Sequence, residues 1–312
     1  MLNKNVVNFL GCDAPYETSD IVLFGAPYDS TTSFRPGARF GPGAMRNESF
    51  GLETYSPYQN GVLTDGAVFD SGDLELSFGD SAAALEEITE RTATILSDNK
   101  LPFMLGGEHL TTLGCVRAVS ARFADLHILH FDAHADLRTD YLGVKLSHAC
   151  VMRRCYELLG DGRIHQFCIR SGDYDEWTFA RAGHVDLHPF DFDGLHQTVT
   201  ALGDTPVYLS VDLDCLDPSV FPGTGTPEAG GVSFTSLLDA LLTVCSKAHV
   251  VGCDVNELAP MLDSSGASTA VACKVVREML IALLPKRERD KKDRKQGSAE
   301  YFVQNCMAKY GQ

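Results

Sequence analysis

Three side chains of the kinds that bind metal ions follow an apolar run in the segment Phe131–Asp136 (FDAHAD). Asp132, His134 and Asp136 occupy alternate positions, and alanines separate them. In an extended backbone, residues i, i+2 and i+4 point to the same face, so these three side chains converge. Acids in a solvated loop would have no reason to alternate with alanine directly after an apolar strand. The spacing therefore predicts a metal site.

Two further segments have a similar arrangement. Asp212 and Asp214 lie at the end of the apolar run Val207–Val211, and two carboxylates this close repel each other unless a cation lies between them. His109 follows a pair of glycines after another apolar run, and glycine permits a tight turn close to a sheet edge. A single Asp-x-Asp pair or a single histidine is a weak signal, but the combination favours metal binding.

The combined set holds two imidazoles, four carboxylates and no thiolate, which favours Mn²⁺ over Zn²⁺ or copper. Six ligands exceed what one ion needs if a position must stay open for water, so a pair of ions about 3.5–4 Å apart is predicted. The predicted ligands are His109, Asp132, His134, Asp136, Asp212 and Asp214. A structural role is predicted for His127, His130, His165, His184, His188, His196 and His249.

The elements that would position these residues are short apolar runs that alternate with amphipathic helical patterns. The expected strands are Ile21–Phe24, Val68–Phe69, Pro102–Leu105, His127–Phe131, His165–Ile169, Val207–Val211 and Val250–Cys253. The expected helices are Ser81–Leu96, Leu110–Phe123, Ser147–Leu159, Ser233–Cys245 and Ser268–Leu284. Continuous apolar strands that alternate with helices are typical of a parallel sheet covered on both faces. In such sheets binding sites form beyond the carboxyl ends of the strands, where the predicted ligands fall.

The chain is predicted to form one domain, residues 1–284, because no linker divides it before Leu284. Residues 285–312 are predicted to be a separate charged tail. Within that tail, Lys286–Lys295 holds seven basic and three acidic residues and no apolar one, which indicates a solvated segment. The interrupting acids and the absence of interleaved aromatics argue against nucleic-acid binding there.

Composition and charge indicate in which cellular compartment the protein is expected and which classes of partner are excluded. The net charge of −16 argues against a nucleic-acid partner and is compatible with a small cationic substrate. No apolar run approaches the roughly 20 residues of a membrane-spanning helix, and the N-terminus lacks the features of a signal peptide. Ten cysteines without a Cys-x-x-Cys pair predict free thiols in a reducing compartment. A cytoplasmic protein without membrane partners is expected.

Several of these segments together resemble the signatures of the ureohydrolase (arginase/agmatinase) family, over about residues 20 to 284. The matching segments are Arg35–Pro42 (RPGARFGP), Gly106–His109 (GGEH), Phe131–Asp136 (FDAHAD), Ser210–Pro218 (SVDLDCLDP), Pro222–Gly231 (PGTGTPEAGG) and Asp254–Pro260 (DVNELAP). The resemblance implies an arginase/deacetylase-like α/β/α fold of three layers with a parallel eight-stranded sheet. It also implies a homotrimer or homohexamer.

The resemblance further implies two Mn²⁺ ions per chain. His109 and Asp136 would bind the first ion and His134 and Asp214 the second. Asp132 would bridge the two ions, together with Asp212. None of the six positions departs from the family pattern.

The resemblance also assigns catalytic roles, to His148 and Glu257 besides the ligand Asp136. A guanidinium stays protonated at neutral pH, so carboxylates must hold it, and Glu257 matches the family glutamate that pairs with it. His148 matches the family histidine that carries a proton to the departing amine. Without the resemblance, His148 would be interpreted as a histidine near a helix cap.

The expected activity is that of an agmatinase, which hydrolyses agmatine to putrescine and urea in polyamine biosynthesis. Arginases carry asparagine and serine in the loop after the metal motif, whereas Leu137–Leu146 contains neither. Arg138 and Lys145 could instead pair with a substrate carboxylate, so a guanidinobutyrase or another guanidino hydrolase, including an arginase-like one, is the alternative. A non-catalytic metal-binding homologue is disfavoured because every catalytic and ligand position is filled.

Overall fold

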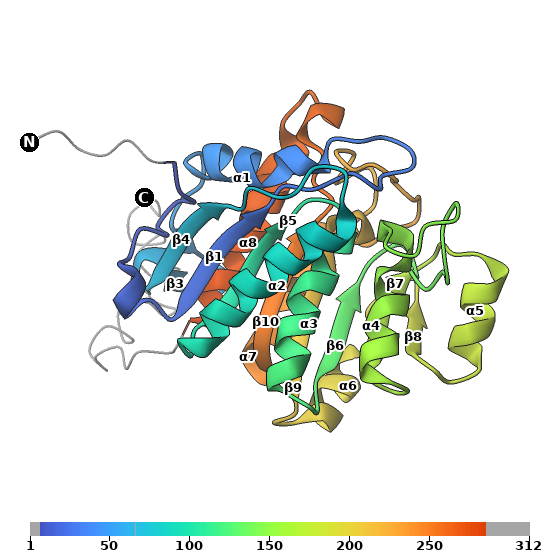
Figure 1. The fold of residues 1–312 in the computed structure, drawn as a ribbon. Coiled ribbons are helices and arrows are strands. Elements are labelled where there is room, and N and C mark those ends of the chain that lie inside the picture. The colour runs from blue at the N-terminus through green and yellow to red at the C-terminus, as the bar shows by residue number, and fades with distance from the viewer. Residues whose placement is uncertain (1–6, 66, 285–312) are drawn as a thin grey trace, which may run out of the picture.

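The computed structural model describes residues 7–65 and 67–284, so the predicted tail, residues 285–312, lies outside the described residues. An eight-stranded sheet runs through the centre (Figure 1). All of its neighbouring strands pair in parallel. In spatial order the strands are β4 (Val68–Asp73), β1 (Ile21–Ala26), β5 (Leu101–Gly106), β10 (His249–Asn256), β9 (Pro206–Asp212), β6 (His127–Phe131), β7 (Ile164–Ile169) and β8 (Asp186–Pro189). Strands β2 (Tyr55–Ser56) and β3 (Gly61–Val62) form a small antiparallel pair.

Helices cover both faces of this sheet. Figure 1 shows α2, α3 and α4 in front of the sheet, with α7 and α8 behind it. The helices that pack with the front core are α2 (Ser81–Ser97), α3 (Thr112–Arg122), α4 (Val151–Leu159) and α5 (Tyr174–Arg181). Those that pack with the rear core are α1 (Gly41–Ser49), α6 (Leu195–Leu202), α7 (Phe234–Lys247) and α8 (Ala267–Leu283). The predicted three-layer α/β/α fold is confirmed.

The central strands are mostly apolar because each of their faces belongs to a different core. In β9, the side chains of Val207 and Leu209 pack into the rear core. Tyr208, which lies between them, packs into the front core. Successive side chains of a strand point to opposite faces, so a strand between two helical layers needs apolar residues on both of its faces. This is the physical reason for the continuous apolar runs in the sequence.

Most predicted helix boundaries are close to the observed ones. Asp80 caps α2, because its side chain accepts hydrogen bonds from two backbone N–H groups of the first turn, as is usual for aspartate at this position. The helix expected at Leu110–Phe123 begins as a 3₁₀ turn, His109–Thr111, before α3. The helix expected at Ser147–Leu159 likewise begins as a 3₁₀ turn, His148–Cys150, before α4.

Besides the small pair β2 and β3, one strand of the central sheet and three α-helices were not predicted from the residues: β8, α1, α5 and α6. Strand β8 is four residues long and lies at the sheet edge, where only one neighbour is needed and polar residues are tolerated. The three helices have eight or nine residues each, so their apolar periodicity spans barely two turns. The parallel sheet of eight strands therefore agrees with the family resemblance rather than with the seven apolar runs.

The structure bears on two expectations from the sequence, the lack of a membrane-spanning helix and the free state of the cysteines. Within them, no helix is long and apolar enough to cross a membrane. The nine cysteines in this part of the chain are all buried and free, as predicted.

Candidate metal centre

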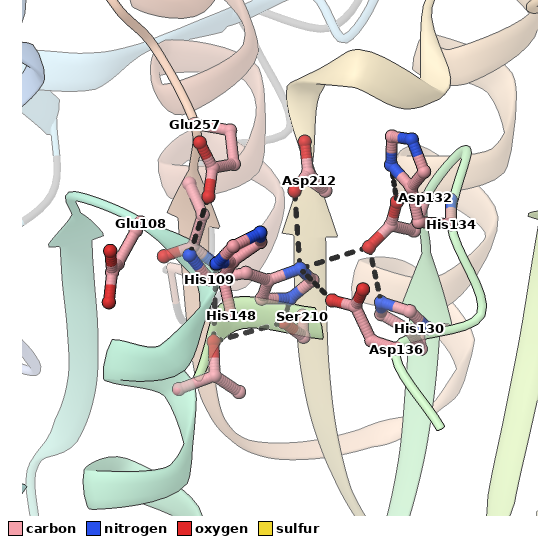
Figure 2. A network of polar contacts seen from close by, with 12 residues as sticks. Glu108, His109, His130, Asp132, His134, Asp136, His148, Ser210, Asp212 and Glu257 are labelled. Carbon is pink, nitrogen blue, oxygen red and sulfur yellow. Dashed lines mark hydrogen bonds and ion pairs between the residues drawn. The ribbon is translucent and has the colours of Figure 1, made fainter. Parts of the chain in front are cut away.

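The predicted ligands lie at the carboxyl ends of neighbouring strands in the middle of the sheet (Figure 2). His109 follows β5, and Asp132, His134 and Asp136 follow β6. Between these two strands lie β10 and β9. Asp212 ends β9, Asp214 lies in the 3₁₀ turn behind it, and Glu257 directly follows β10. Residues separated by up to 148 positions in the chain, such as His109 and Glu257, thereby meet at one edge.

His109 is the centre of one group of candidate ligands. Its Nδ1 lies 2.9 Å from Asp132 Oδ2, 3.2 Å from Asp212 Oδ2 and 3.4 Å from Asp136 Oδ2. His109, Asp132 and Asp136, with His130 beside them, form a buried cluster that could hold a metal ion.

His134 is the centre of a second group. Its Nδ1 lies 3.0 Å from Asp214 Oδ2 and 3.5 Å from Asp132 Oδ1. His134, Asp132 and Asp214 could hold a second ion. Asp132 belongs to both groups and presents a different oxygen to each, as a bridging carboxylate would.

The donor atoms fit a metal better than they fit one another. His109 Nδ1 and Asp214 Oδ2 are buried and have no hydrogen-bond partner among the described residues, although His109 Nδ1 lies 2.9 Å from Asp132 Oδ2 and Asp214 Oδ2 lies 3.0 Å from His134 Nδ1. Ligand atoms that converge on one ion are close to one another without being aligned for hydrogen bonds. Burial raises the pKa of Asp212 well above its ordinary value, and the carboxylates of Asp214 and Asp132 raise it further. A bound cation would compensate this repulsion.

Backbone conformation at the site is unusual at two acidic residues. Asp136 has φ = 54° and Glu257 has φ = 68°, in the left-handed region that residues other than glycine seldom adopt. Strained residues of this kind cluster at functional sites. The approach of the neighbouring segments also requires glycine, because a Cβ at Gly107 would lie 2.0 Å from the carbonyl oxygen of Tyr28.

The imidazole of His109 is held from behind by a chain of buried polar groups. Its Nε2 lies 2.9 Å from Ser210 Oγ, which donates to Asp254 Oδ1 at 2.8 Å. Tyr208 and Asn256 also donate to Asp254. Because the Ser210 hydroxyl gives its proton to Asp254, it accepts one from His109 Nε2, which leaves the Nδ1 lone pair facing the three carboxylates. Such partners fix the orientation of a ligating histidine.

The ligand cluster opens into a cavity of about 270 Å³. Besides the ligands, Glu257, His148, Arg138 and Glu176 line it. Glu257 Oε1 accepts a hydrogen bond from the backbone N–H of His109 at 2.7 Å. Burial, and after it the nearby carboxylate of Glu108, raises the pKa of Glu257 to about 8. A carboxylate in this position would be stabilised by a cationic partner.

His148 lies on the same cavity wall, held by a neighbouring loop. Its backbone N–H donates to Thr31 Oγ1 at 3.1 Å. Thr31 in turn donates through its hydroxyl, at 2.6 Å, and through its backbone N–H, at 2.9 Å, to the buried carboxylate of Glu108. Burial lowers the pKa of His148, so the imidazole is neutral near pH 7 and can accept a proton.

The two basic residues of the loop after the metal motif have different surroundings. Arg138 lines the cavity, but its guanidinium is paired with Asp173 at 2.6 Å and lies 3.5 Å from Glu176. Lys145 is exposed and does not line the cavity. Among the described residues that line the cavity, Arg138 is the only arginine or lysine. Its charge is already balanced.

The structure therefore brings together all the residues predicted for the site, His148 and Glu257 included. It also adds residues that were not predicted. His130 was set aside as structural, yet its Nε2 lies 2.9 Å from Asp132 Oδ2. Ser210 and Asp254 stand behind His109, and Glu108 holds Thr31. The signal that could have found His130 and Ser210 is a polar residue inside a largely apolar strand, two positions from a predicted site residue and on the same face. Asp254 and Glu108 do not have this spacing.

Comparison with known proteins agrees with this geometry. The sequence profile of the arginase family matches residues 19–282. The agmatinase of Bacillus cereus is 41% identical over 275 residues, which cover 88% of this chain and 95% of that protein. The human mitochondrial guanidino acid hydrolase is 33% identical over 285 residues, which cover 86% of this chain and 81% of that protein.

Among solved structures, the agmatine ureohydrolase of Thermoplasma volcanium superposes with a TM-score of 0.82 at 31% identity, covering 95% of this chain and 98% of that one. The sequence match, the sheet topology and the double histidine–aspartate cluster have one common explanation. The chain belongs to the arginase family.

Proposed function

We propose that this chain is an agmatinase that hydrolyses agmatine to putrescine and urea with two Mn²⁺ ions, and so supplies putrescine for polyamine biosynthesis. The observation that carries the proposal is the double cluster of candidate ligands, which opens into a cavity whose wall holds Glu257. Agmatinases are also among the relatives of this chain, at 40–42% identity over 88% of its length. The donor set of imidazoles and carboxylates, without thiolates, favours manganese.

His109, Asp132 and Asp136 would bind one ion, and His134 and Asp214 the other. Asp132 would bridge the two through its separate oxygens, and Asp212, whose Oδ2 lies 3.2 Å from His109 Nδ1, is proposed as the second bridging ligand. When bound, such a pair of ions lowers the pKa of water to about 7 and supplies hydroxide.

Glu257 would orient the substrate. One of its oxygens accepts the N–H of His109, which fixes the carboxylate plane, and the other can pair with the planar guanidinium. His148 would take up a proton while neutral and deliver it to the departing amine. Glu176, which also lines the cavity and lies 3.5 Å from Arg138, would accept the distant ammonium group of agmatine.

The charge balance of the cavity favours agmatine over substrates with a carboxylate. Arg138 would be the partner of such a group, but its guanidinium is already paired with Asp173. A buried charge without a partner costs several kcal/mol. Guanidinobutyrate carries a carboxylate where agmatine carries an ammonium, so the same argument disfavours a guanidino acid hydrolase, although the human relative has that name.

Urea release by the manganese-loaded protein tests the substrate. We expect kcat/KM for agmatine to exceed that for arginine by roughly 10⁴–10⁵, the discrimination of a site that leaves a polar group unsatisfied. Guanidinobutyrate should also be a poor substrate. Comparable turnover of arginine and agmatine would contradict the agmatinase assignment, and the chain would then be a hydrolase of the arginase family whose substrate is unknown. Faster turnover of guanidinobutyrate would establish the alternative activity.

Replacing Arg138 tests the charge argument separately. Because its charge is already balanced, Arg138→Ala should leave agmatine preferred over guanidinobutyrate, with kcat/KM for agmatine changed by less than about tenfold, as for loss of a partly exposed ion pair. Lys145→Ala is the matched control, since it removes the same charge from an exposed position on the same loop. A wild-type activity on guanidinobutyrate that Arg138→Ala abolishes would show that Arg138 binds substrate.

A further inference from the structure

His130 is a fully buried polar side chain inside strand β6, between the apolar residues Leu129 and Phe131. It lies two positions before Asp132, so the two side chains share a face of the extended chain. Its Nε2 is 2.9 Å from Asp132 Oδ2, and its ring lies 5.0 Å from that of His109, centroid to centroid. Figure 2 shows His130 beside Asp132, with dashed lines from one oxygen of Asp132 to both His130 and His109. The position leaves two roles open: a metal ligand, or a group that holds Asp132.

Gln166 determines which nitrogen of His130 carries the proton. It pairs with His130 across strands β6 and β7 and is fully buried. Its Nε2 donates to the carbonyl oxygen of Ala135 at 2.7 Å and lies 2.9 Å from His130 Nδ1. A carbonyl oxygen only accepts, so the amide nitrogen must face it, and the second N–H of that nitrogen points to His130. His130 Nδ1 is therefore the acceptor, and Nε2 carries the proton that is donated to Asp132.

This donation completes the surroundings of Asp132. Its Oδ1 accepts the backbone N–H of His134 at 2.6 Å, and its Oδ2 accepts the Nε2–H of His130. Each oxygen thus accepts one hydrogen bond from the protein, and the two hydrogen bonds hold the carboxylate plane. Each oxygen keeps a lone pair that could bind a metal ion, Oδ2 on the His109 side and Oδ1 on the His134 side. Since Nε2 carries a proton, it has no lone pair to give to an ion.

We propose that His130 and Gln166 are positioning residues, which hold Asp132 Oδ2 toward the ion on the His109 side, and that His130 is not a ligand. The inference rests on the proposed two-ion centre. Loss of either side chain should weaken that ion selectively, because Oδ1 and its donor His134 N–H remain in place. Partners of this kind typically change metal affinity by 10–100-fold.

Manganese binding without substrate tests the proposal. Metal-free wild type, His130→Phe and Gln166→Met are titrated with Mn²⁺, with free Mn²⁺ followed by electron paramagnetic resonance. His127→Phe, on the same strand but outside the cluster, is the control. We expect both variants to bind one ion as wild type does and the other about 10–100-fold more weakly. Circular dichroism and Tm of the metal-free chains show whether each variant folds. If His130→Phe does not fold, Gln166→Met decides.

Combining Gln166→Met with a substitution that removes one of the two metal sites shows which ion is weakened. It should weaken the ion that remains in a His134→Ala chain, and it should not affect the ion that remains in a His109→Ala chain. If Gln166→Met binds both ions normally while His130→Phe loses one of them, His130 is a direct ligand and the proposal is overturned. Wild-type binding by both variants, or equal weakening of both ions, would also overturn it.

These outcomes are independent of the substrate, so a failed agmatine assay does not affect them. A wild-type chain that binds fewer than two ions would overturn the two-ion centre itself, and this inference with it.

Discussion

Replacing Asp132 by alanine is expected to remove both metal ions and to lower the rate of urea formation by on the order of 10³-fold or more. Asp132 is the residue that belongs to both ligand groups, with Oδ2 2.9 Å from His109 Nδ1 and Oδ1 3.5 Å from His134 Nδ1. Without it, neither group keeps its set of donors. Water outside such a centre retains a pKa near 15.7 instead of about 7, so hydroxide is scarce at neutral pH.

Elemental analysis after dialysis measures the metal, and steady-state kinetics with agmatine measures the rate. Asp140→Ala is the matched control, because it removes an exposed carboxylate from the same loop and changes the net charge by the same amount. It should retain two ions and wild-type activity. An Asp132→Ala chain that still holds two ions would show that another residue bridges them.

Replacing His148 by asparagine should lower kcat by about 10²–10⁴, the usual contribution of a general acid–base group, and leave the bound metal unchanged. His148 lines the cavity with Glu257 and the ligands, but it belongs to neither ligand group. Its surroundings are hydroxyls, of Thr31, Ser33 and Ser147, at 3.4–3.5 Å from its ring nitrogens. Such a site suits a group that exchanges protons.

The pH dependence of kcat gives this prediction a second readout. Because burial lowers the pKa of His148, its neutral form predominates at neutral pH and is lost only as the pH falls through that lowered pKa. The acidic limb that His148 contributes should be absent from the variant. His249→Asn, which replaces an exposed histidine remote from the cavity, should behave as wild type. Loss of manganese from His148→Asn would mean that His148 is a ligand, and an unchanged kcat would exclude it from proton transfer.

The sequence allowed the central sheet and the ligand set to be predicted because both depend on local patterns. Alternation of Asp132, His134 and Asp136 with alanine follows from strand geometry. The continuous apolar run before Asp212 follows from burial on both faces. These features are visible within a window of about ten residues, the length of a strand and its following turn. The predicted ligands lie together for that reason.

Other parts of the site depend on contacts between distant segments and could not be predicted from such windows. His130 looks like any histidine in a strand until Gln166, on the neighbouring strand, shows which nitrogen donates. The neutralisation of Arg138 depends on Asp173, 35 residues further along the chain. Strand β8 was missed because a four-residue edge strand needs little apolar character.

The order of the strands has a consequence for how the site comes into being. Strands β9 and β10 occupy the middle of the sheet, between β5 and β6, yet they are the last two strands of the chain. While the chain is being synthesised, residues up to 205 include His109, Asp132 and His134 but not the strands that join the two halves of the sheet. Such a nascent chain has two open strand edges, on β5 and β6, which are prone to pair with other chains. Residues 206–256 supply both of the strands that cover these edges, together with Asp212 and Asp214 of the ligand set.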